Sequence, residues 1–166
     1  MRKKCMALGL LLCLLPGLAG CRFHKSDSMD FYYVRNHYQY GQPQGVICPE
    51  SRDVTGHAQD LPYLMALYLS GPLDEGLSSP FPRGTRLVSL YTQDNTLFVE
   101  LTPPGSGTSS ADFTLSSSCL ALTFLYFSNV DQVTVTSGEN TITLNAENLL
   151  LYDQPSYSST TTEETK

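Results

Sequence analysis

An apolar helical pattern, an abrupt stop and the start of a strand follow one another within Leu61–Leu90. Apolar side chains recur there at the three- and four-residue spacing of one helix face: Tyr63, Leu64, Leu67 and Tyr68. This spacing predicts a helix from about Asp60 to Ser70, with Asp60 as the cap of its first turn. Gly71 and Pro72 should end the helix, because glycine adopts the left-handed conformation of a C-terminal cap and proline cannot donate the next hydrogen bond.

Short runs of β-branched and aromatic residues predict strands on both sides of this helix. They fall into three pairs that we expect to form hairpins: Phe31–Val34 with Val46–Cys48, Arg86–Thr92 with Leu97–Thr102, and Val133–Thr136 with Ile142–Leu144. In the second pair, Leu97, Val99 and Leu101 recur at every second position, which is the period of a half-buried strand. Asp94 and Asn95 suit the turn of that hairpin because both tolerate positive φ.

A second helical pattern extends from about Asp112 to Phe127 and is apolar over an unusually wide arc. Its apolar residues form two stripes: Leu115, Cys119, Leu122 and Tyr126 on one, and Leu120, Phe124 and Phe127 on the other. Either this helix lies inside the core, or part of its surface belongs to a partner. Two helices among five or six strands predict an α+β fold, with both helices packed on one face of a mixed β-sheet.

The first twenty residues have the features of a secretory leader. Arg2–Lys4 is a positively charged start, and Cys5–Leu15 is an apolar stretch too short for a comfortable membrane span. Leu18-Ala19-Gly20-Cys21 resembles the bacterial lipobox, which implies cleavage before Cys21 and a lipid on its sulfur. An ordinary secretory signal cut nearby, or a cytoplasmic protein with an apolar start, is the alternative.

These features predict four segments: a lipoprotein signal peptide at 1–20, a tether at 21–30, a single domain at 31–153 and a disordered polar tail at 154–166. A lipidated Cys21 would hold the domain at the extracytoplasmic face of the cell membrane, since two acyl chains are enough for stable anchoring.

From Cys21 onward the chain carries seven basic and sixteen acidic residues, a net charge of −9. We expect no nucleic-acid partner, because nucleic acid binds basic patches. Beyond Cys21 only two cysteines remain. Cys119 lies in an apolar helical run, where a buried free thiol is ordinary. We therefore expect Cys48 and Cys119 to be free, although an extracytoplasmic setting also permits a disulfide between them.

Patterns typical of catalysis are weak along the chain. Pro104–Gly107 lies between a strand and a helix but lacks the lysine and the glycine spacing of phosphate-binding loops. The three histidines do not have zinc-ligand spacing, and the sequence contains no G-x-S-x-G. Asp74 and Glu75 adjoin Gly- and Ser-rich sequence, where carboxylates more often face solvent than act as a catalytic pair. We expect no enzymatic activity, cofactor or metal site.

Tyrosines are dense around the first predicted hairpin, at Tyr32, Tyr33, Tyr38 and Tyr40. Half-buried β structure accounts for such a cluster, and a contact patch or a sugar-stacking platform is the alternative. Together with one stripe of the second helix, they give a predicted contact surface: Tyr32, Tyr33, Leu120, Phe124 and Phe127.

Two short motifs carry a resemblance to a known family. Leu67-x-x-Ser70-Gly71-Pro72 is followed by Phe81-Pro82-Arg83-Gly84-Thr85-Arg86, then by the hairpin and by a helix that leads into Val130–Val133. This order resembles the GerMN domain, a lipoprotein domain of sporulation and germination in spore-forming bacteria, over roughly Leu61–Leu144. The matching motif residues are Leu67, Gly71, Pro72, Pro82, Gly84 and Thr85.

The resemblance implies a non-enzymatic domain, similar to ring-building motifs, that assembles with other sporulation envelope proteins. We expect a lipid-anchored extracytoplasmic protein that acts by protein-protein contact, with a homo-oligomer as a further option. A lipid-anchored ligand-binding or hydrolytic accessory protein of the cell wall is the alternative. The motif residues are expected to shape the backbone, with contacts on the second helix and the exposed sheet edges.

Overall fold

The computed structural model describes residues 27–37, 45–103, 108–125 and 130–149. Along these residues the elements follow in the order β1 (Ser28–Arg35), β2 (Ile47–Asp53), α1 (Leu61–Leu69), β3 (Leu77–Ser78), β4 (Leu87–Gln93), β5 (Thr96–Leu101), α2 (Ser110–Leu125), β6 (Gln132–Ser137) and β7 (Asn140–Asn145). Both predicted helices and all three predicted hairpins are confirmed. The two-residue strand β3 was missed, because its pairing with β1 leaves no local pattern in so short a run.

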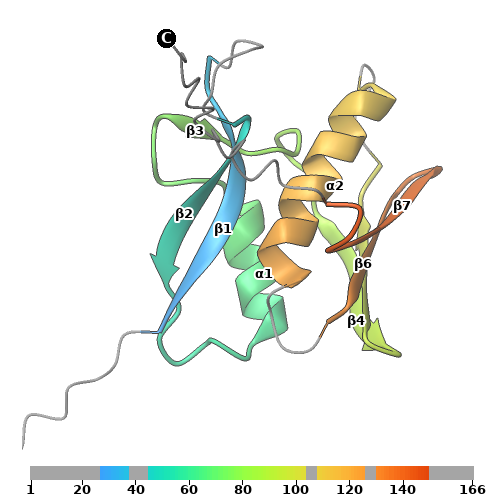
Figure 1. Ribbon diagram of the computed structural model, residues 1–166, viewed down its shortest axis with the longest axis horizontal. Helices are drawn as coiled ribbons and strands as arrows, with labels where there is room; N and C mark the ends of the chain where they lie inside the picture. Colours follow the sequence, from blue (N-terminus) through green and yellow to red (C-terminus); the bar gives the residue numbers. More distant parts are fainter. Residues whose placement is uncertain (1–26, 38–44, 104–107, 126–129, 150–166) are drawn as a thin grey trace, which may run out of the picture.

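The α+β class is confirmed, but the strands form two sheets instead of the expected single one. One sheet has the order β2-β1-β3 and is antiparallel. The other has the order β4-β5-β6-β7, in which β5 and β6 are parallel because α2 connects them as a crossover. Figure 1 shows α2 between the two sheets, with α1 beside β1 and β2.

The wide apolar arc of α2 explains this arrangement. The helix contacts β1 on one side and β6 and β7 on the other, so two faces of it are buried at once. The backbone N–H of Tyr32 in β1 also donates to the hydroxyl of Thr123 in α2, at 3.0 Å. Of the two interpretations of this helix, burial in the core is therefore confirmed for most of its described residues from Phe113 onward, while residues 110–112 are exposed.

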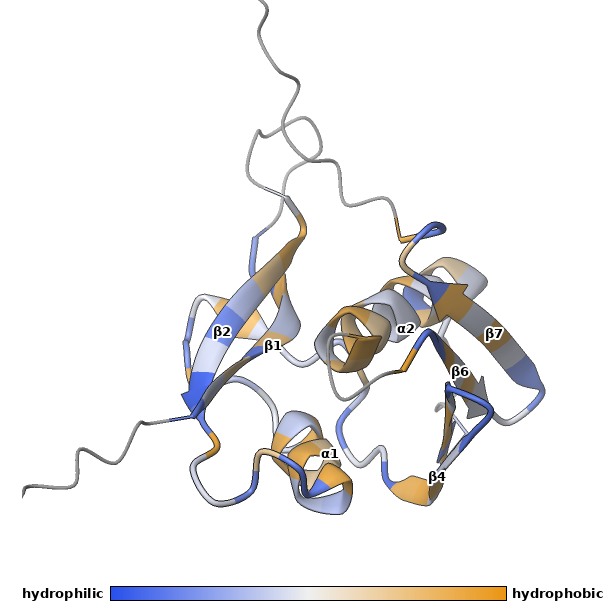
Figure 2. Cartoon of the chain, turned by 60° about the horizontal axis from the view of Figure 1, so that its bottom comes forward, coloured by the Kyte–Doolittle hydropathy of each residue, from blue (hydrophilic) through white to orange (hydrophobic). Residues whose placement is uncertain are grey.

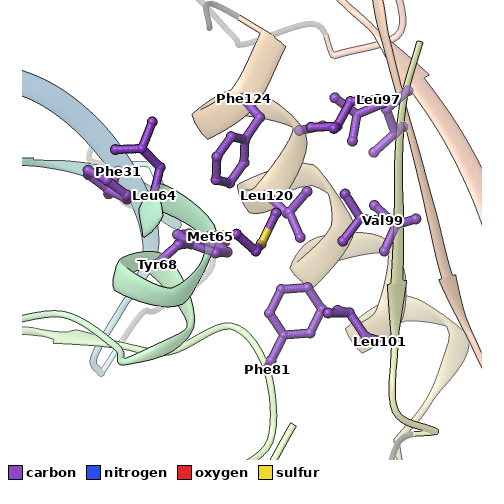
Figure 3. Close-up of a cluster of buried hydrophobic side chains, with 14 of the residues drawn as sticks. Phe31, Leu64, Met65, Tyr68, Phe81, Leu97, Val99, Leu101, Leu120 and Phe124 are labelled. Carbon is purple, nitrogen blue, oxygen red and sulfur yellow. The ribbon is translucent and has the colours of Figure 1, made fainter. Parts of the chain in front are cut away.

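The core between the layers is built from aromatic and aliphatic side chains. Leu120 and Phe124 of α2 lie between Met65 and Tyr68 of α1 and the inward-facing residues of β5 (Figure 3). The predicted alternation of β5 is confirmed, since Leu97, Val99 and Leu101 are all buried. Figure 2 shows α1 and much of α2 as hydrophobic, whereas β2 is hydrophilic along much of its length.

Burial corrects part of the predicted contact surface. Tyr33, Leu120 and Phe124 have no exposed area, because the second sheet and α1 cover the faces that the sequence left open. Tyr32 is half-buried, and Phe127 lies outside the described residues together with Tyr38 and Tyr40. Tyr33, Leu120 and Phe124 are therefore not available as part of the predicted contact surface.

Local turn chemistry agrees with the structure. A side-chain oxygen of Asp60 accepts a hydrogen bond from the backbone N–H of Tyr63 at 3.1 Å and caps α1. Asp94 and Asn95 both have positive φ in the β4–β5 turn, at 47° and 59°.

The tether ends earlier than predicted. Residues 28–30 already belong to β1, where they pair with residues 51–53 of β2. Backbone pairing needs no apolar pattern, and the one apolar residue of this segment, Met29, did not indicate a strand. Within the described ranges, no helix is long and apolar enough to cross a membrane.

Candidate functional site

Five of the six motif residues line one cleft of about 560 Å³. They are Gly71, Pro72, Pro82, Gly84 and Thr85. The walls of the cleft are the end of α1 with the corner after it (69–72), β3 with the next residue (77–79) and the loop 81–85. Two motifs whose prolines, Pro72 and Pro82, are ten positions apart in the sequence therefore meet in space. The sequence predicted a role for them in shaping the backbone, but not that they enclose a common space.

The two glycines of this motif cleft have a backbone conformation that other residues rarely adopt. Gly71 and Gly84 both have φ of 90°. Beside Gly84, the carbonyl oxygen of Pro82 accepts hydrogen bonds from the N–H of Thr85 at 3.2 Å and from its hydroxyl at 2.8 Å. These contacts close a tight turn, so one wall of the cleft is preformed.

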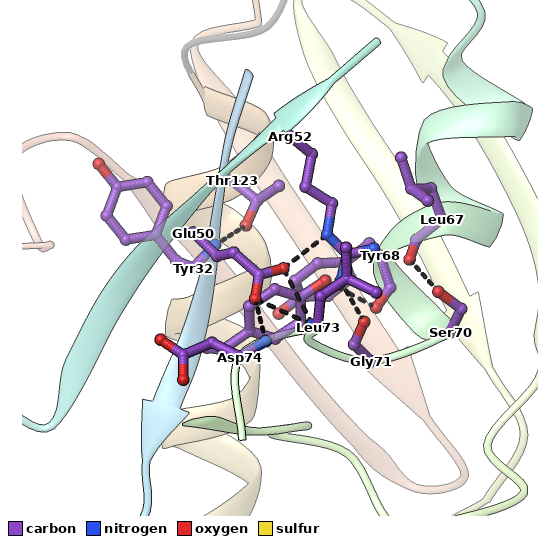
Figure 4. Close-up of polar contacts among 11 residues, drawn as sticks. Tyr32, Glu50, Arg52, Leu67, Tyr68, Ser70, Gly71, Leu73, Asp74 and Thr123 are labelled. Carbon is purple, nitrogen blue, oxygen red and sulfur yellow. Dashed lines mark hydrogen bonds and ion pairs between the residues drawn. The ribbon is translucent and has the colours of Figure 1, made fainter. Parts of the chain in front are cut away.

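A buried ion pair on β2 holds the opposite wall (Figure 4). Glu50 accepts hydrogen bonds from the backbone N–H groups of Leu73 at 2.9 Å and Asp74 at 2.7 Å, and its other oxygen lies 2.6 Å from Nε of Arg52. Nη2 of Arg52 donates to the carbonyl oxygen of Gly71. The pair thus fixes the corner where α1 ends.

Arg52 is buried on the inner side of β2, where its guanidinium carbon lies 5.8 Å and 5.7 Å from the ring centres of Phe31 and Tyr33. Burial would raise the pKa of Glu50, but the backbone N–H of Asp74 and the Arg52 guanidinium together hold that pKa below its ordinary value. Glu50 is therefore ionised at neutral pH. The sequence did not predict this pair. The i, i+2 spacing of Glu50 and Arg52 puts both side chains on one face of the strand, but it does not indicate that they bind the backbone of the corner after α1.

The hydroxyl groups around the cleft are engaged in local structure. Those of Ser70, Ser78 and Thr85 donate to backbone carbonyls, and that of Ser79 accepts from the N–H of Phe81. Arg83 is the one charged side chain among the lining residues, and it is exposed. The arrangement presents a shaped, partly apolar cleft with a cation at its rim.

The groups considered for catalysis lie elsewhere and have structural contacts. His57 stacks on Tyr63 at the start of α1, with ring centres 4.0 Å apart. Asp74 accepts from the N–H of Gly76 at 2.7 Å, within its own loop. Among the described residues, no group of three His, Cys, Asp or Glu side chains could hold a metal ion. Pro104–Gly107 lies outside those residues.

Cys48 and Cys119 are free and buried. Burial raises the pKa of the Cys119 thiol to about 12, so it is protonated at neutral pH and is a poor nucleophile. The two free thiols agree with the expectation from the sequence.

A second exposed surface lies on the outer face of the four-stranded sheet. Tyr91 and Phe98 stack there with ring centres 4.9 Å apart, and the hydroxyls of Thr134 and Thr143 are 2.9 Å apart on the neighbouring strands. Tyr91 is 50 % exposed, so the rings remain partly open to solvent. This face holds a hollow of about 280 Å³.

The fold is a two-sheet α+β domain in which the two motifs line one cleft. Germane, a family described as "Sporulation and spore germination", matches residues 30–143. The chain belongs to this family, and the match begins well before the Leu61 at which the resemblance in the sequence was placed.

Solved structures of similar fold include the first GerMN domain of the sporulation protein GerM from Bacillus subtilis, at 17% identity and a TM-score of 0.49, covering 70% of this chain and 86% of that one. The tandem GerMN domains of the same protein match at 17% identity and a TM-score of 0.45, over 69% of this chain and 40% of that one. A predicted lipoprotein from Clostridium perfringens matches at 14% identity and a TM-score of 0.46, over 74% and 89% of the two chains. No curated protein matches the chain.

Proposed function

We propose that this protein is anchored by a lipid on Cys21 at the extracytoplasmic face of the membrane and binds another envelope protein during sporulation or germination. The motif cleft is the contact site. The domain works by binding and not by catalysis. The observation that carries the proposal is the convergence of five motif residues on one cleft.

The character of the cleft supports binding over hydrolysis. Its hydroxyls are held by backbone contacts, and its charged lining residue is an arginine, which is always protonated and cannot act as a base. A hydrolase needs a nucleophile or an activated water held by a base. Arginine is instead enriched at protein interfaces, and Leu73, which follows the cleft residue Pro72, adds an apolar side chain that is 80 % exposed.

The membership in the Germane family supports the setting in sporulation or germination. The lipobox-like Leu18–Cys21 supports the anchor, since a lipidated cysteine would follow directly on a leader of twenty residues. An anchor of this kind leaves the domain free to meet partners at the membrane surface.

Photo-cross-linking in sporulating cells of the native organism tests the contact. A photoreactive phenylalanine derivative replaces Ser79 in the cleft wall, and the matched control carries it at Gln93, an exposed residue at the end of β4. We expect a discrete adduct from position 79 and none from position 93. An adduct of twice the chain mass would identify a second copy as the partner.

Two results would overturn the proposal. One is the absence of any adduct from position 79 while the protein is abundant and folded. The other is hydrolysis of peptidoglycan fragments by the purified chain, with loss of that activity on His57→Ala or Asp74→Asn.

A further inference from the structure

We propose that the motif cleft takes an acidic segment of the partner protein, with carboxylates bound by Arg83 and Arg86 and apolar side chains set against the cleft walls. This inference rests on the proposed function and names the chemistry of its partner. It comes from the distribution of charge over the domain.

The exposed arginines of the described residues lie in one short segment. The described residues include four basic side chains, Arg35, Arg52, Arg83 and Arg86, against thirteen acidic ones. Arg52 is buried against Glu50, and Arg35 is partly buried with its Nε enclosed by protein. Arg83 and Arg86 are the two that are exposed. Both belong to the segment that forms one wall of the cleft and leads from it into β4.

Within the part of the chain that the structure describes, no ion pair involves Arg83 or Arg86. In a domain with this excess of carboxylates, Arg83 at the rim of the cleft and Arg86 three residues further along the chain are a focus of positive potential. A carboxylate is a fitting ligand, because the guanidinium fork binds both of its oxygens.

The two arginines project from fixed backbone. Arg83 lies inside the turn that the carbonyl of Pro82 closes, and the N–H of Arg86 donates to the hydroxyl of Thr102 at 3.0 Å on the neighbouring strand. Fixed attachment points lower the entropy lost when a ligand orders the side chains.

Apolar residues in part of the cleft wall, which also carries serine and threonine side chains, favour a peptide over other anions. Leu69, Pro72, Leu77, Phe81 and Pro82 line the cleft beside Arg83. A volume of about 560 Å³ accommodates a few side chains. A phosphate polymer or a lipid headgroup would meet the arginines but leave these walls without a partner, whereas a segment of alternating acidic and apolar residues satisfies both.

Fluorescence anisotropy with the full chain in detergent tests the inference. The probe is a fluorescein-labelled ten-residue peptide of alternating Glu and Leu, and its matched control has Gln in place of every Glu. We expect binding of the Glu peptide that weakens as salt rises, and about tenfold or more weaker binding for Arg83→Gln. The charge control is Gln93→Glu, which changes the net charge by the same amount at the far end of β4 and should leave the affinity unchanged.

The inference is overturned if the Gln peptide binds as tightly as the Glu peptide, or if Arg83→Gln and Gln93→Glu have equal effects. Binding of inorganic polyphosphate or phosphatidylglycerol vesicles that depends on Arg83, in the absence of peptide binding, also overturns it. If photo-cross-links from position 79 persist in Arg83→Gln, the proposed contact stands and only the acidic character of the partner segment is refuted. The two proposals therefore fail separately. Circular dichroism confirms that each variant is folded.

Discussion

Arg52 donates a hydrogen bond to the carbonyl oxygen of Gly71 and so joins the middle of β2 to the corner at which α1 ends. The carboxylate of Glu50 binds the next turn of the same corner, through the N–H groups of Leu73 and Asp74. One wall of the motif cleft therefore depends on a strand that precedes it by about twenty residues.

Removal of the Arg52 side chain should destabilise the domain strongly. In Arg52→Met the apolar stem is kept, but Glu50 loses its buried counter-charge and Gly71 loses a donor. We expect a loss of about 3 kcal/mol in the free energy of unfolding, measured by urea denaturation. Arg86→Met is the control, because its exposed side chain should contribute less than about 0.5 kcal/mol. Equal effects of the two substitutions would contradict the role of the buried pair.

Glu50 should make stability depend on pH in the acid range. Its pKa in the folded chain lies below the ordinary value of 4.5, despite burial, because the Asp74 N–H and Arg52 stabilise the charged form. Such a group stabilises the fold above its unfolded pKa, and this contribution is lost as the pH falls through the lower folded pKa. In Glu50→Gln, the decrease in stability from about pH 5 downward should be shallower than in the wild type. Identical pH profiles would show that Glu50 is not the titrating group.

A side chain at Gly84 should cost stability through the backbone alone. A Cβ there meets no atom within 4 Å, but φ is 90°, which L-residues rarely adopt. Gly84→Ala should therefore lower the free energy of unfolding by about 1 to 2 kcal/mol without a steric clash. Gly45→Ala, at a position without positive φ, is the control and should have a smaller effect. A neutral Gly84→Ala would mean that the turn adopts another conformation.

The thiols of the mature chain should be protected until it unfolds. Cys48 and Cys119 are buried, and the pKa of Cys119 is raised to about 12, so little thiolate is present at pH 8. We expect slow alkylation in buffer and rapid alkylation of both in denaturant without reductant, counted by mass spectrometry. An unreactive pair in denaturant would reveal a disulfide instead.

Lipidation is expected to depend on one residue. Cells grown with a fatty-acid probe should label the wild-type protein and not Cys21→Ala, because the thioether forms on that sulfur. The variant should leave the membrane fraction as well. Label that persists in Cys21→Ala would rule out the anchor, while Cys48→Ala serves as a control that keeps the lipobox.

Features that depend on neighbours in the chain were predictable from the sequence. Asp60 caps α1, Gly71 ends it with positive φ, and Asp94 and Asn95 turn the second hairpin, since each of these roles follows from one residue's own conformational preferences. The family motifs could also be recognised in the sequence, and the match over residues 30–143 confirms the family.

Features that depend on distant pairing were not predictable in the same way. The wide apolar arc of α2 left two interpretations open, and only the packing of α1 and the second sheet decided that Tyr33, Leu120 and Phe124 are enclosed. Residues 28–30 were assigned to a tether, since backbone pairing with β2 has no signature in side-chain character.

By itself the sequence determined the two helices, the three hairpins and the turn of the second hairpin, because periodicity and turn residues act over a few positions. Only the tertiary structure decided that two separate motifs enclose one cleft, that Glu50 and Arg52 hold its wall, and that Arg83 stands at its rim. These contacts depend on how layers pack, and packing brings together residues whose spacing in the chain carries no signal of their meeting.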